Sequence, residues 1–306
     1  MHILTKFLLL PGLCLATALS SASAKTPSFV LFLVDDLGYM DVGAYNPKCF
    51  YDTPNVDALA KSGMKFTDGY AANPVCSPTR FGVQTGRYPS RKDATNFFSG
   101  RRGGLFNSAP LHSRMDLEEV TIAEALKKKG YATFFAGKWH LGLEESARPH
   151  SHGFDRWYGH MAGCIDYFSH VFYWGANRGG PGQNPTHDLW EDNQEIWQNG
   201  EYFTEMIVEK AILYIREAAK SDKPFFLYVP FNAPHYPMHA PEKYMNRFSH
   251  LPWDRKVMAA MISAVDDGVG QIMAELERQG VADNTCTFFT SDNGPSRESR
   301  NWLDGT

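Results

Sequence analysis

Cys76 opens the run Cys76-Ser77-Pro78-Thr79-Arg80, in which a thiol precedes an arginine by four residues. Pro78 favours a helix start just after the thiol, so Cys76 is predicted at or near a helix N-terminus with Arg80 about one turn away. An unmodified thiol acts as a nucleophile only as the thiolate, and the helix N-terminus and the arginine are expected to lower its pKa. Taken alone, the run fits equally well a loop with a buried thiol and a surface arginine.

Two pairs of adjacent polar residues have the donor atoms of a metal site. Asp35 and Asp36 end an apolar run near the start of the chain, and Asp292 and Asn293 stand near its other end. Carboxylate and amide oxygens suit Ca²⁺ or Mg²⁺, whereas zinc would favour His or Cys at these places. Each pair alone also fits a loop cap or a common turn, so the prediction depends on the two pairs meeting in the fold.

Lys138 and His140 lie two residues apart, in a run that begins and ends with glycine. In an extended chain this spacing puts both side chains on one face, with Trp139 on the other. A lysine and a histidine packed under a strand end can also be structural, so their role depends on what lies beside them.

Hydrophobic runs alternate with helix signals along the chain, which predicts an α/β fold with a sheet wrapped by helices. Predicted strands cover residues 28–34, 131–136, 224–230 and 285–290. Predicted helices run from the capping Thr53 to Gly63, from the capping box Thr121–Glu124 to Gly130, and over 201–219 and 253–279. Residues 144–200 show no sustained period, and we expect them to form a long excursion with little regular structure.

The polar candidates follow the predicted strands. Asp35 and Asp36 come after the first strand, Lys138 and His140 after the second, His235 after the third, and Asp292 with Asn293 after the fourth. In an open α/β sheet, ligands bind beyond the carboxyl ends of the strands, so these four segments are expected to converge on one edge. The sequence therefore predicts one site there, centred on Cys76.

Together, the Cys76–Arg80 run, the Asp35-Asp36 pair and the runs Gly137–Gly142 and Ser291–Gly294 resemble those of the sulfatase family, over a span from about residue 29 to the last residue. The resemblance implies an alkaline-phosphatase-like fold, with a mostly parallel central sheet flanked by helices on both faces. It also implies that a formylglycine-generating enzyme oxidises Cys76 to formylglycine. The aldehyde hydrate of that residue has two hydroxyls on one carbon, so one can attack sulfur and the other can later expel sulfate.

The resemblance carries the family's site residues over to the matching positions. Asp35, Asp36, Asp292 and Asn293, together with Cys76, are implied to bind a divalent cation, usually Ca²⁺, with Mg²⁺ as an alternative. Arg80 is implied to hold the hydrate, Lys138 to contact sulfate, and His140 to bond the hydrate. His235 matches the histidine near the leaving-group oxygen, a candidate general acid. His239 is a weaker rival that we expect at a pocket wall or on the surface.

The chain also departs from the family pattern. Sulfatases use a second lysine beyond the Asp-Asn pair, and here no lysine follows Lys256. The C-terminal antiparallel subdomain of the family fold is missing as well. We therefore expect a sulfatase truncated at its C-terminal end, with an exposed sheet edge and weak turnover.

Residues 1–24 are typical of an export signal, with Lys6, an apolar core and a small-residue cleavage site. The predicted domains are therefore a signal peptide over 1–24 and an incomplete sulfatase N-terminal catalytic domain over 25–306. The protein is expected to be exported, to the periplasm or the extracellular space, with no membrane association after signal cleavage. A formal charge of −4 with only short basic clusters excludes nucleic acid as a partner.

The expected activity is hydrolysis of sulfate monoesters, on a sulfated small molecule or a sulfated carbohydrate. One rival is a phosphonate or phosphate monoester hydrolase on the same scaffold, and another is an inactive fragment that binds calcium or sulfated glycans. The aromatic-rich stretch Tyr167–Trp174 fits either stacking on a sugar or aryl group, or packing in the core.

Overall fold

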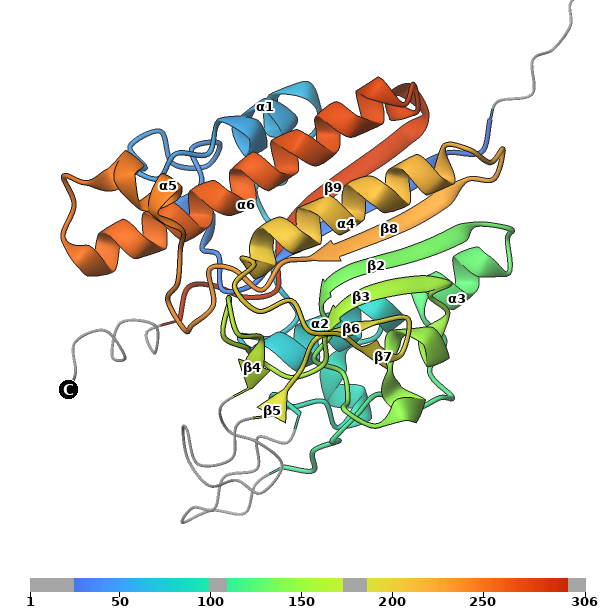
Figure 1. Ribbon diagram of the computed structural model, residues 1–306. Coiled ribbons are helices and arrows are strands. Elements are labelled where there is room, and N and C mark those ends of the chain that lie inside the picture. Colours follow the sequence, from blue (N-terminus) through green and yellow to red (C-terminus); the bar gives the residue numbers. More distant parts are fainter. Residues whose placement is uncertain (1–24, 99–108, 173–185, 297–306) are drawn as a thin grey trace, which may run out of the picture.

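The computed structural model describes residues 25–98, 109–172 and 186–296 (Figure 1). A seven-stranded sheet in the order β7-β6-β3-β2-β8-β1-β9 forms its centre. The five parallel strands are β3 (Arg156–His160), β2 (Ala132–Lys138), β8 (Phe225–Pro230), β1 (Ser28–Val34) and β9 (Thr285–Ser291). The antiparallel strands β6 (Trp190–Glu191) and β7 (Gln194–Glu195) extend one side, and β4 (Val171–Phe172) pairs with β5 (Thr186–His187) in a second small sheet. The predicted signal peptide lies outside the described residues.

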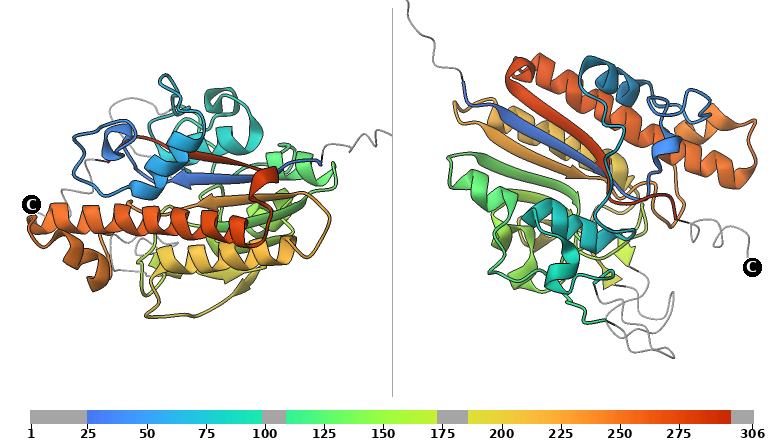
Figure 2. Two further views of the ribbon diagram at one scale, coloured as in Figure 1. Left: turned by 90° about the horizontal axis from the view of Figure 1, so that it is seen from above. Right: turned by 180° about the vertical axis from the view of Figure 1, so that it is seen from behind.

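Helices cover both faces of the sheet (Figure 2). Successive side chains of β1 point to opposite faces, so Phe32 joins one core cluster and Leu33 the other. The first cluster includes residues of α1 (Pro54–Ser62), α4 (Phe203–Ala218) and α6 (Trp253–Arg278). The second includes residues of α2 (Cys76–Thr85) and α3 (Ile122–Lys127). This arrangement confirms the predicted α/β class with a mostly parallel sheet between two helical layers.

Short helical segments complete the regular structure of the described residues. They are α5 (Glu242–Met245) and the 3₁₀ turns Tyr39–Asp41, Pro89–Lys92, Glu145–Ala147, Pro149–His152, Asn246–Phe248 and Ala282–Asn284. The long helix α6 is apolar enough over part of its length to match a membrane-crossing segment in composition, yet 67% of that part is buried inside the protein. It packs against α4, α1 and α5, as a core helix does.

The predicted strands agree with the structure to within two residues at each end. The predicted capping box is also present: Thr121 Oγ1 accepts from the backbone N–H of Glu124 (3.1 Å), and the Glu124 carboxylate accepts from the N–H of Thr121 (2.8 Å). The helix ends at Lys127 rather than at Gly130. Propensity and turn signals were sufficient to predict these strands and this capping box, because the local sequence pattern and the tertiary fold agree.

The interpretation of residues 144–200 was wrong, because this span contributes β3 to the main sheet. β3 carries large aromatic rings beside Gly159 instead of an alternating apolar pattern. Gly159 has φ +147°, and a Cβ there would lie 1.8 Å from the carbonyl oxygen of Gly137 on β2. The glycine that interrupts the strand signal is therefore the residue that allows the two strands to pair closely.

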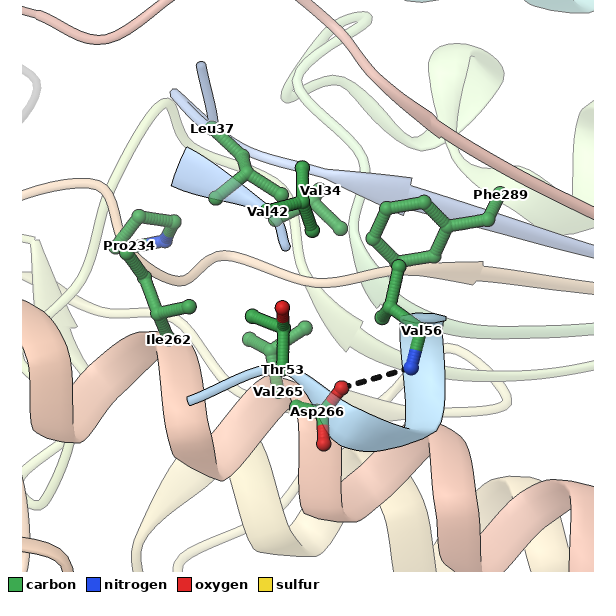
Figure 3. A pocket seen from close by; sticks show the side chains of 10 residues that line it. All are labelled: Val34, Leu37, Val42, Thr53, Val56, Pro234, Ile262, Val265, Asp266 and Phe289. Carbon is green, nitrogen blue, oxygen red and sulfur yellow. Dashed lines mark hydrogen bonds between the residues drawn. The ribbon is translucent and has the colours of Figure 1, made fainter. Parts of the chain in front are cut away.

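Thr53 precedes α1 as predicted, but its side chain does not cap the helix. Its hydroxyl accepts from the N–H of Gly43 (2.9 Å) and donates to Asp57 (3.2 Å). Asp266 of α6 takes the capping role, since its carboxylate accepts from the N–H groups of Asn55 (3.1 Å) and Val56 (2.8 Å), and Figure 3 shows the latter bond. A carboxylate from a distant helix thus satisfies the first turn of α1.

β9 forms one edge of the sheet and, within the described residues, pairs only with β1. Cys286, Phe288 and Thr290 are exposed, and the side chains between them are partly buried.

Candidate active site

The parallel strands bring the predicted site residues to one edge of the sheet. Lys138 is the last residue of β2, Asp35 follows β1 directly, and Asp292 follows β9. The strands are in register, with Val34 of β1 opposite Ser291 of β9. The predicted convergence of four segments is therefore what the topology produces.

Asp35, Asp36, Asp292 and Asn293 form a buried group between β1 and β9. The N–H of Asp36 donates to Asp292 Oδ1 (3.2 Å), and Asn293 Nδ2 donates to Asp36 Oδ1 (2.5 Å). Asp36 adopts φ 65°, a left-handed conformation that Asp and Asn tolerate better than other side chains. That turn of the backbone places the carboxylates of the neighbouring residues Asp35 and Asp36 in the same cluster.

Arg80 lies one helical turn after Cys76 and is fully buried. Its guanidinium donates to Asp292 Oδ2 from Nε (3.1 Å) and Nη2 (2.8 Å), and to the carbonyl oxygen of Lys138 from Nη1 (2.9 Å). Nη2 also lies 3.4 Å from Asp35 Oδ1. The Arg80 guanidinium therefore connects the start of α2 with β2 and with both carboxylate pairs.

Lys138 and His140 both reach the cluster, but not through the extended chain that the sequence suggested. Lys138 Nζ makes a direct ion pair with Asp35 Oδ2. His140 has φ 56°, so the strand has already ended in a left-handed turn when it reaches this residue. Its ring packs against Gly163, where a Cβ would lie 2.7 Å from His140 Cε1. Burial, with the positive charges of Lys138 and Arg80, holds the pKa of His140 well below its usual range.

Cys76 is the first residue of α2, as predicted, but its environment does not favour the thiolate. Burial raises the pKa of the thiol well above its usual value, and the charges of Asp35 and Asp292 raise it further, while Lys138 opposes them. The expectation of a lowered pKa was wrong because three nearby carboxylates and desolvation outweigh the helix terminus. Burial and the surrounding carboxylates therefore disfavour the thiolate of an unmodified Cys76.

His235 lies on the loop after β8, opposite the carboxylates. Its Nδ1 hydrogen-bonds with the carbonyl oxygen of Tyr236 (2.7 Å), and its Nε2 lies 3.8 Å from Asp36 Oδ2. Ligand atoms of Asp35, Asp36, Cys76 and His235 all lie within 4.8 Å of one another. The rival His239 contacts Asp166 instead, with its Nδ1 3.3 Å from the carboxylate.

The side chains at this edge fit a hard divalent cation. Asp35 Oδ1 and Asn293 Oδ1 are buried and have no hydrogen-bond partner within the described part of the chain. Both are oxygen atoms, which favours Ca²⁺ or Mg²⁺ over zinc even though Cys76 and His235 lie close by. Burial and the neighbouring charge of Asp35 raise the pKa of Asp292 to about 6, against the opposing charge of Arg80. A divalent cation at this position would add to the positive charges of Arg80 and Lys138 and stabilise the carboxylates further.

A sulfatase family model matches residues 27–306 of the chain. The chain belongs to the sulfatase family. This sulfatase is 33% identical over 310 residues to N-acetylgalactosamine-6-sulfatase of Rattus norvegicus, covering 94% of this chain and 53% of that protein. It is 33% identical over 322 residues to arylsulfatase A of Homo sapiens, covering 96% of this chain and 57% of that protein. The sulfatase thus spans about half the length of the curated relatives it matches.

The similarity of this sulfatase to solved structures extends to the fold. The crystal structure of Ps i-CgsB in complex with k-i-k-neocarrahexaose matches it with a TM-score of 0.76 and 34% sequence identity. The match covers 90% of this chain and 60% of that chain. The predicted family resemblance and alkaline-phosphatase-like fold are confirmed.

Sequence reasoning missed one residue of the sulfatase site region, His160. It ends β3, lies opposite Lys138 in the strand register, and is fully buried with Nδ1 4.0 Å from Asp188 Oδ2. Burial lowers its pKa well below the usual value, and the charges of Lys138 and Arg80 lower it further. His160 was missed because β3 itself was missed. A signal was present, since His160 is a polar residue at the end of an aromatic run, as Lys138 is at the end of β2.

Another buried histidine of the sulfatase gives a prediction about pH. His152 is fully buried beside Trp139, and burial lowers its pKa below 6.5. The unfolded chain binds a proton near pH 6.5 that the folded protein does not bind, so His152 makes the protein less stable as the pH falls through that value. Between pH 7.5 and 5.5 this single group is expected to lower the free energy of unfolding by up to about 1.4 kcal/mol.

Urea unfolding of wild type and His152→Leu at the two pH values checks this prediction. The loss of stability on acidification should be smaller in the variant by about 1 kcal/mol. His150→Gln, at an exposed histidine two residues away, is the matched control and should lose as much stability as wild type. An equal loss in the His152→Leu protein would contradict the assignment.

Proposed function

We propose that this chain carries the catalytic centre of an exported sulfatase that hydrolyses sulfate monoesters through a formylglycine at position 76. The observation that carries the proposal is the meeting of Cys76 with Asp35, Asp36 and His235, whose ligand atoms lie within 4.8 Å of one another. The raised pKa of the unmodified thiol supports the same view, because a protonated thiol in this cluster has no evident catalytic use.

Formylglycine would supply a hydrate with two hydroxyls on one carbon, one to attack sulfur and the other to expel sulfate. Asp35, Asp36, Asp292 and Asn293, with residue 76, would hold a divalent cation, which supplies Lewis acidity toward sulfate oxygens. We propose Ca²⁺, with Mg²⁺ as the alternative. Asp35 Oδ1 and Asn293 Oδ1, which are buried and accept no hydrogen bond within the described residues, support these ligands.

The chain's own cations would bind the anionic substrate. Arg80 is held rigidly by two hydrogen bonds to Asp292, so its charge beside residue 76 is fixed before substrate arrives. Lys138 is paired with Asp35 at the same edge and would offer its positive charge to a sulfate oxygen. His140, neutral at working pH because of its lowered pKa, would accept a proton from the hydrate.

His235 would act as the general acid toward the leaving-group oxygen. Because Nδ1 hydrogen-bonds with the carbonyl of Tyr236, Nδ1 carries a proton and Nε2 faces the cluster. In the protonated ring, Nε2 can donate to the departing alcohol. We further propose a sulfated carbohydrate as substrate, which the name of the N-acetylgalactosamine-6-sulfatase relative favours.

Release of sulfate and phosphate from paired 4-nitrophenyl esters tests the proposal. The chain, produced together with a formylglycine-generating enzyme, is expected to hydrolyse the sulfate ester faster than the phosphate ester. Intact mass should show position 76 about 18 Da lighter than cysteine. Faster phosphate release would favour a phosphate or phosphonate hydrolase, and an unmodified thiol without turnover would favour a binding protein.

The cation site gives a prediction that does not require activity. Adding Ca²⁺ to the chelated protein is expected to raise Tm, and a free concentration of 100 Kd corresponds to about 2.7 kcal/mol of added stability. Asp36→Asn should remove most of this response, because it deletes one charge while asparagine still tolerates the left-handed φ of 65°.

Thermal unfolding with a chelator, Ca²⁺ or Mg²⁺ measures the response. Asp93→Asn is the matched control, since Asp93 is exposed and also left-handed, with φ 52°. That variant should respond as wild type does. A full response in Asp36→Asn would show that the cation binds elsewhere.

A further inference from the structure

The hydroxyl of Tyr167 contacts the loop that carries His235 at two points. Its oxygen lies 2.8 Å from the carbonyl oxygen of Asn232 and 2.8 Å from that of His235, so the two acceptors share its single proton. Tyr167 is fully buried, and its sequence neighbours belong to the segment between β3 and β4 rather than to the loop. One side chain from a distant segment therefore joins both ends of a four-residue turn.

Besides its approach to Asp36, the imidazole is fixed through the backbone of its loop, which the N–H of Asp35 also holds by donating to the carbonyl oxygen of Ala233 (3.2 Å). The N–H of His235 donates to the carbonyl of Asn232 (3.2 Å), which closes the turn. The ring is held by its own Nδ1 bond to the next carbonyl, that of Tyr236 (2.7 Å). Because that acceptor belongs to the same backbone, the direction of the ring depends on where the peptide units on either side of His235 are held.

The ring of Tyr167 is itself immobilised, so its hydroxyl is a fixed point. It stacks on Tyr202 with centroids 5.5 Å apart and contacts the edge of His239 at 6.1 Å. Burial raises the pKa of Tyr167 well above its usual value, so the hydroxyl keeps its proton and remains a donor. The aromatic stretch that was left open between sugar stacking and core packing thus contributes a buried core residue at this position.

We propose that Tyr167 is a positioning residue for His235. The hydroxyl of Tyr167 holds the carbonyls of residues 232 and 235 and thereby aims Nε2 of His235 at the leaving-group oxygen. The assignment rests on the proposed function for the role of His235. It adds a residue that touches neither the substrate nor the cation ligands and acts only through the loop.

Kinetics on esters with different leaving groups test this role. A general acid matters most when the departing alcohol is a strong base, and it contributes about 10²–10⁴-fold there. Tyr167→Phe is expected to lower kcat about 10-fold on an alkyl or sugar sulfate and less than about 2-fold on 4-nitrophenyl sulfate. A variant that merely loosened the core would lower both rates by the same factor, and that result would overturn the proposal.

A double-mutant cycle with His235→Ala tests whether the effect runs through His235. If it does, Tyr167→Phe should cost nothing further in the His235→Ala background. Equal losses in both backgrounds would refute the assignment, even if His235 proves not to be the acid. Tyr131→Phe is the matched control, because this buried hydroxyl also donates to a backbone carbonyl, that of Pro27 (2.8 Å), at the opposite end of β2. It should leave the dependence on the leaving group unchanged.

The nitrogen resonances of the His235 ring give a readout that needs no turnover. Wild type is expected to show one neutral tautomer with the proton on Nδ1, and Tyr167→Phe a mixture of both tautomers. A chain inactive on every ester would contradict the proposed function, not the role of Tyr167. An unchanged single tautomer in the variant would overturn the role of Tyr167 in that case too.

Discussion

Replacing Cys76 by alanine is expected to lower sulfate ester hydrolysis by at least about 10⁴-fold. The thiol carbon is the precursor of the proposed nucleophile, and no other side chain in the cluster can form an aldehyde hydrate. The fold should persist, because the change removes one buried sulfur atom from the first turn of α2. Initial rates on 4-nitrophenyl sulfate, with Tm as the measure of folding, check the prediction.

Cys286→Ala is the control for this variant, since Cys286 is exposed on β9. It should retain the activity of wild type and the mass decrease of about 18 Da, whereas Cys76→Ala should show no such decrease. A mass decrease that persists in Cys76→Ala would place the modification at another residue. Residual activity within about 10-fold of wild type would rule out Cys76 as the source of the nucleophile.

Arg80→Met is expected to lower the free energy of unfolding by about 3–5 kcal/mol, because it leaves the buried carboxylate of Asp292 without its counter-charge. Both Asp292 and Asp35 contact the guanidinium, and all three side chains are fully buried. Methionine keeps most of the volume, so the loss reports charge more than packing. Urea unfolding in the presence of a chelator measures it.

Two features separate this expectation from an ordinary destabilising change. The deficit should be smaller at pH 5 than at pH 8, since protonation of the unpaired Asp292 carboxylate relieves the cost. Arg216→Met, the control, should lose about 1 kcal/mol or less, because Glu275 keeps Arg278 and Gln279 as partners. Equal deficits in the two arginine variants would contradict the assigned role of the Arg80 cluster.

Much of the fold and of the site could be predicted because local signals and tertiary structure agree in β1, β2, β8 and β9. Polar residues stand at or shortly after the carboxyl end of each of these strands, and parallel pairing carries all four ends to one edge. Cys76, Arg80, Asp35, Asp36, Lys138, His140, His235, Asp292 and Asn293 come together there for that reason. The strand-end residues could be placed from their positions after the predicted strands, whereas Cys76 and Arg80 reach the site on helix α2.

The features that could not be predicted depend on contacts between distant segments. Gly159 is needed because the backbone of β2 approaches it, and no local pattern reveals that approach. The cap of α1 comes from Asp266, more than two hundred residues away in the chain. The pKa of the Cys76 thiol is raised by burial and by carboxylates from both ends of the sequence, none of which the local run around Cys76 reveals.

Within the described residues β9 pairs only with β1, and strands with a neighbour on one side only are where a sheet begins to open. Its carboxyl end is nevertheless tied down, because Asp292 accepts from Arg80 and from the N–H of Asp36. The contacts of Asp292 therefore hold the carboxyl end of β9 in place, and we expect β9 to open from its Thr285 end inward. Opening of β9 and alignment of the site residues are then coupled. A substitution that loosens the strand misaligns the sulfate site, and a ligand bound at the site slows the opening of the strand.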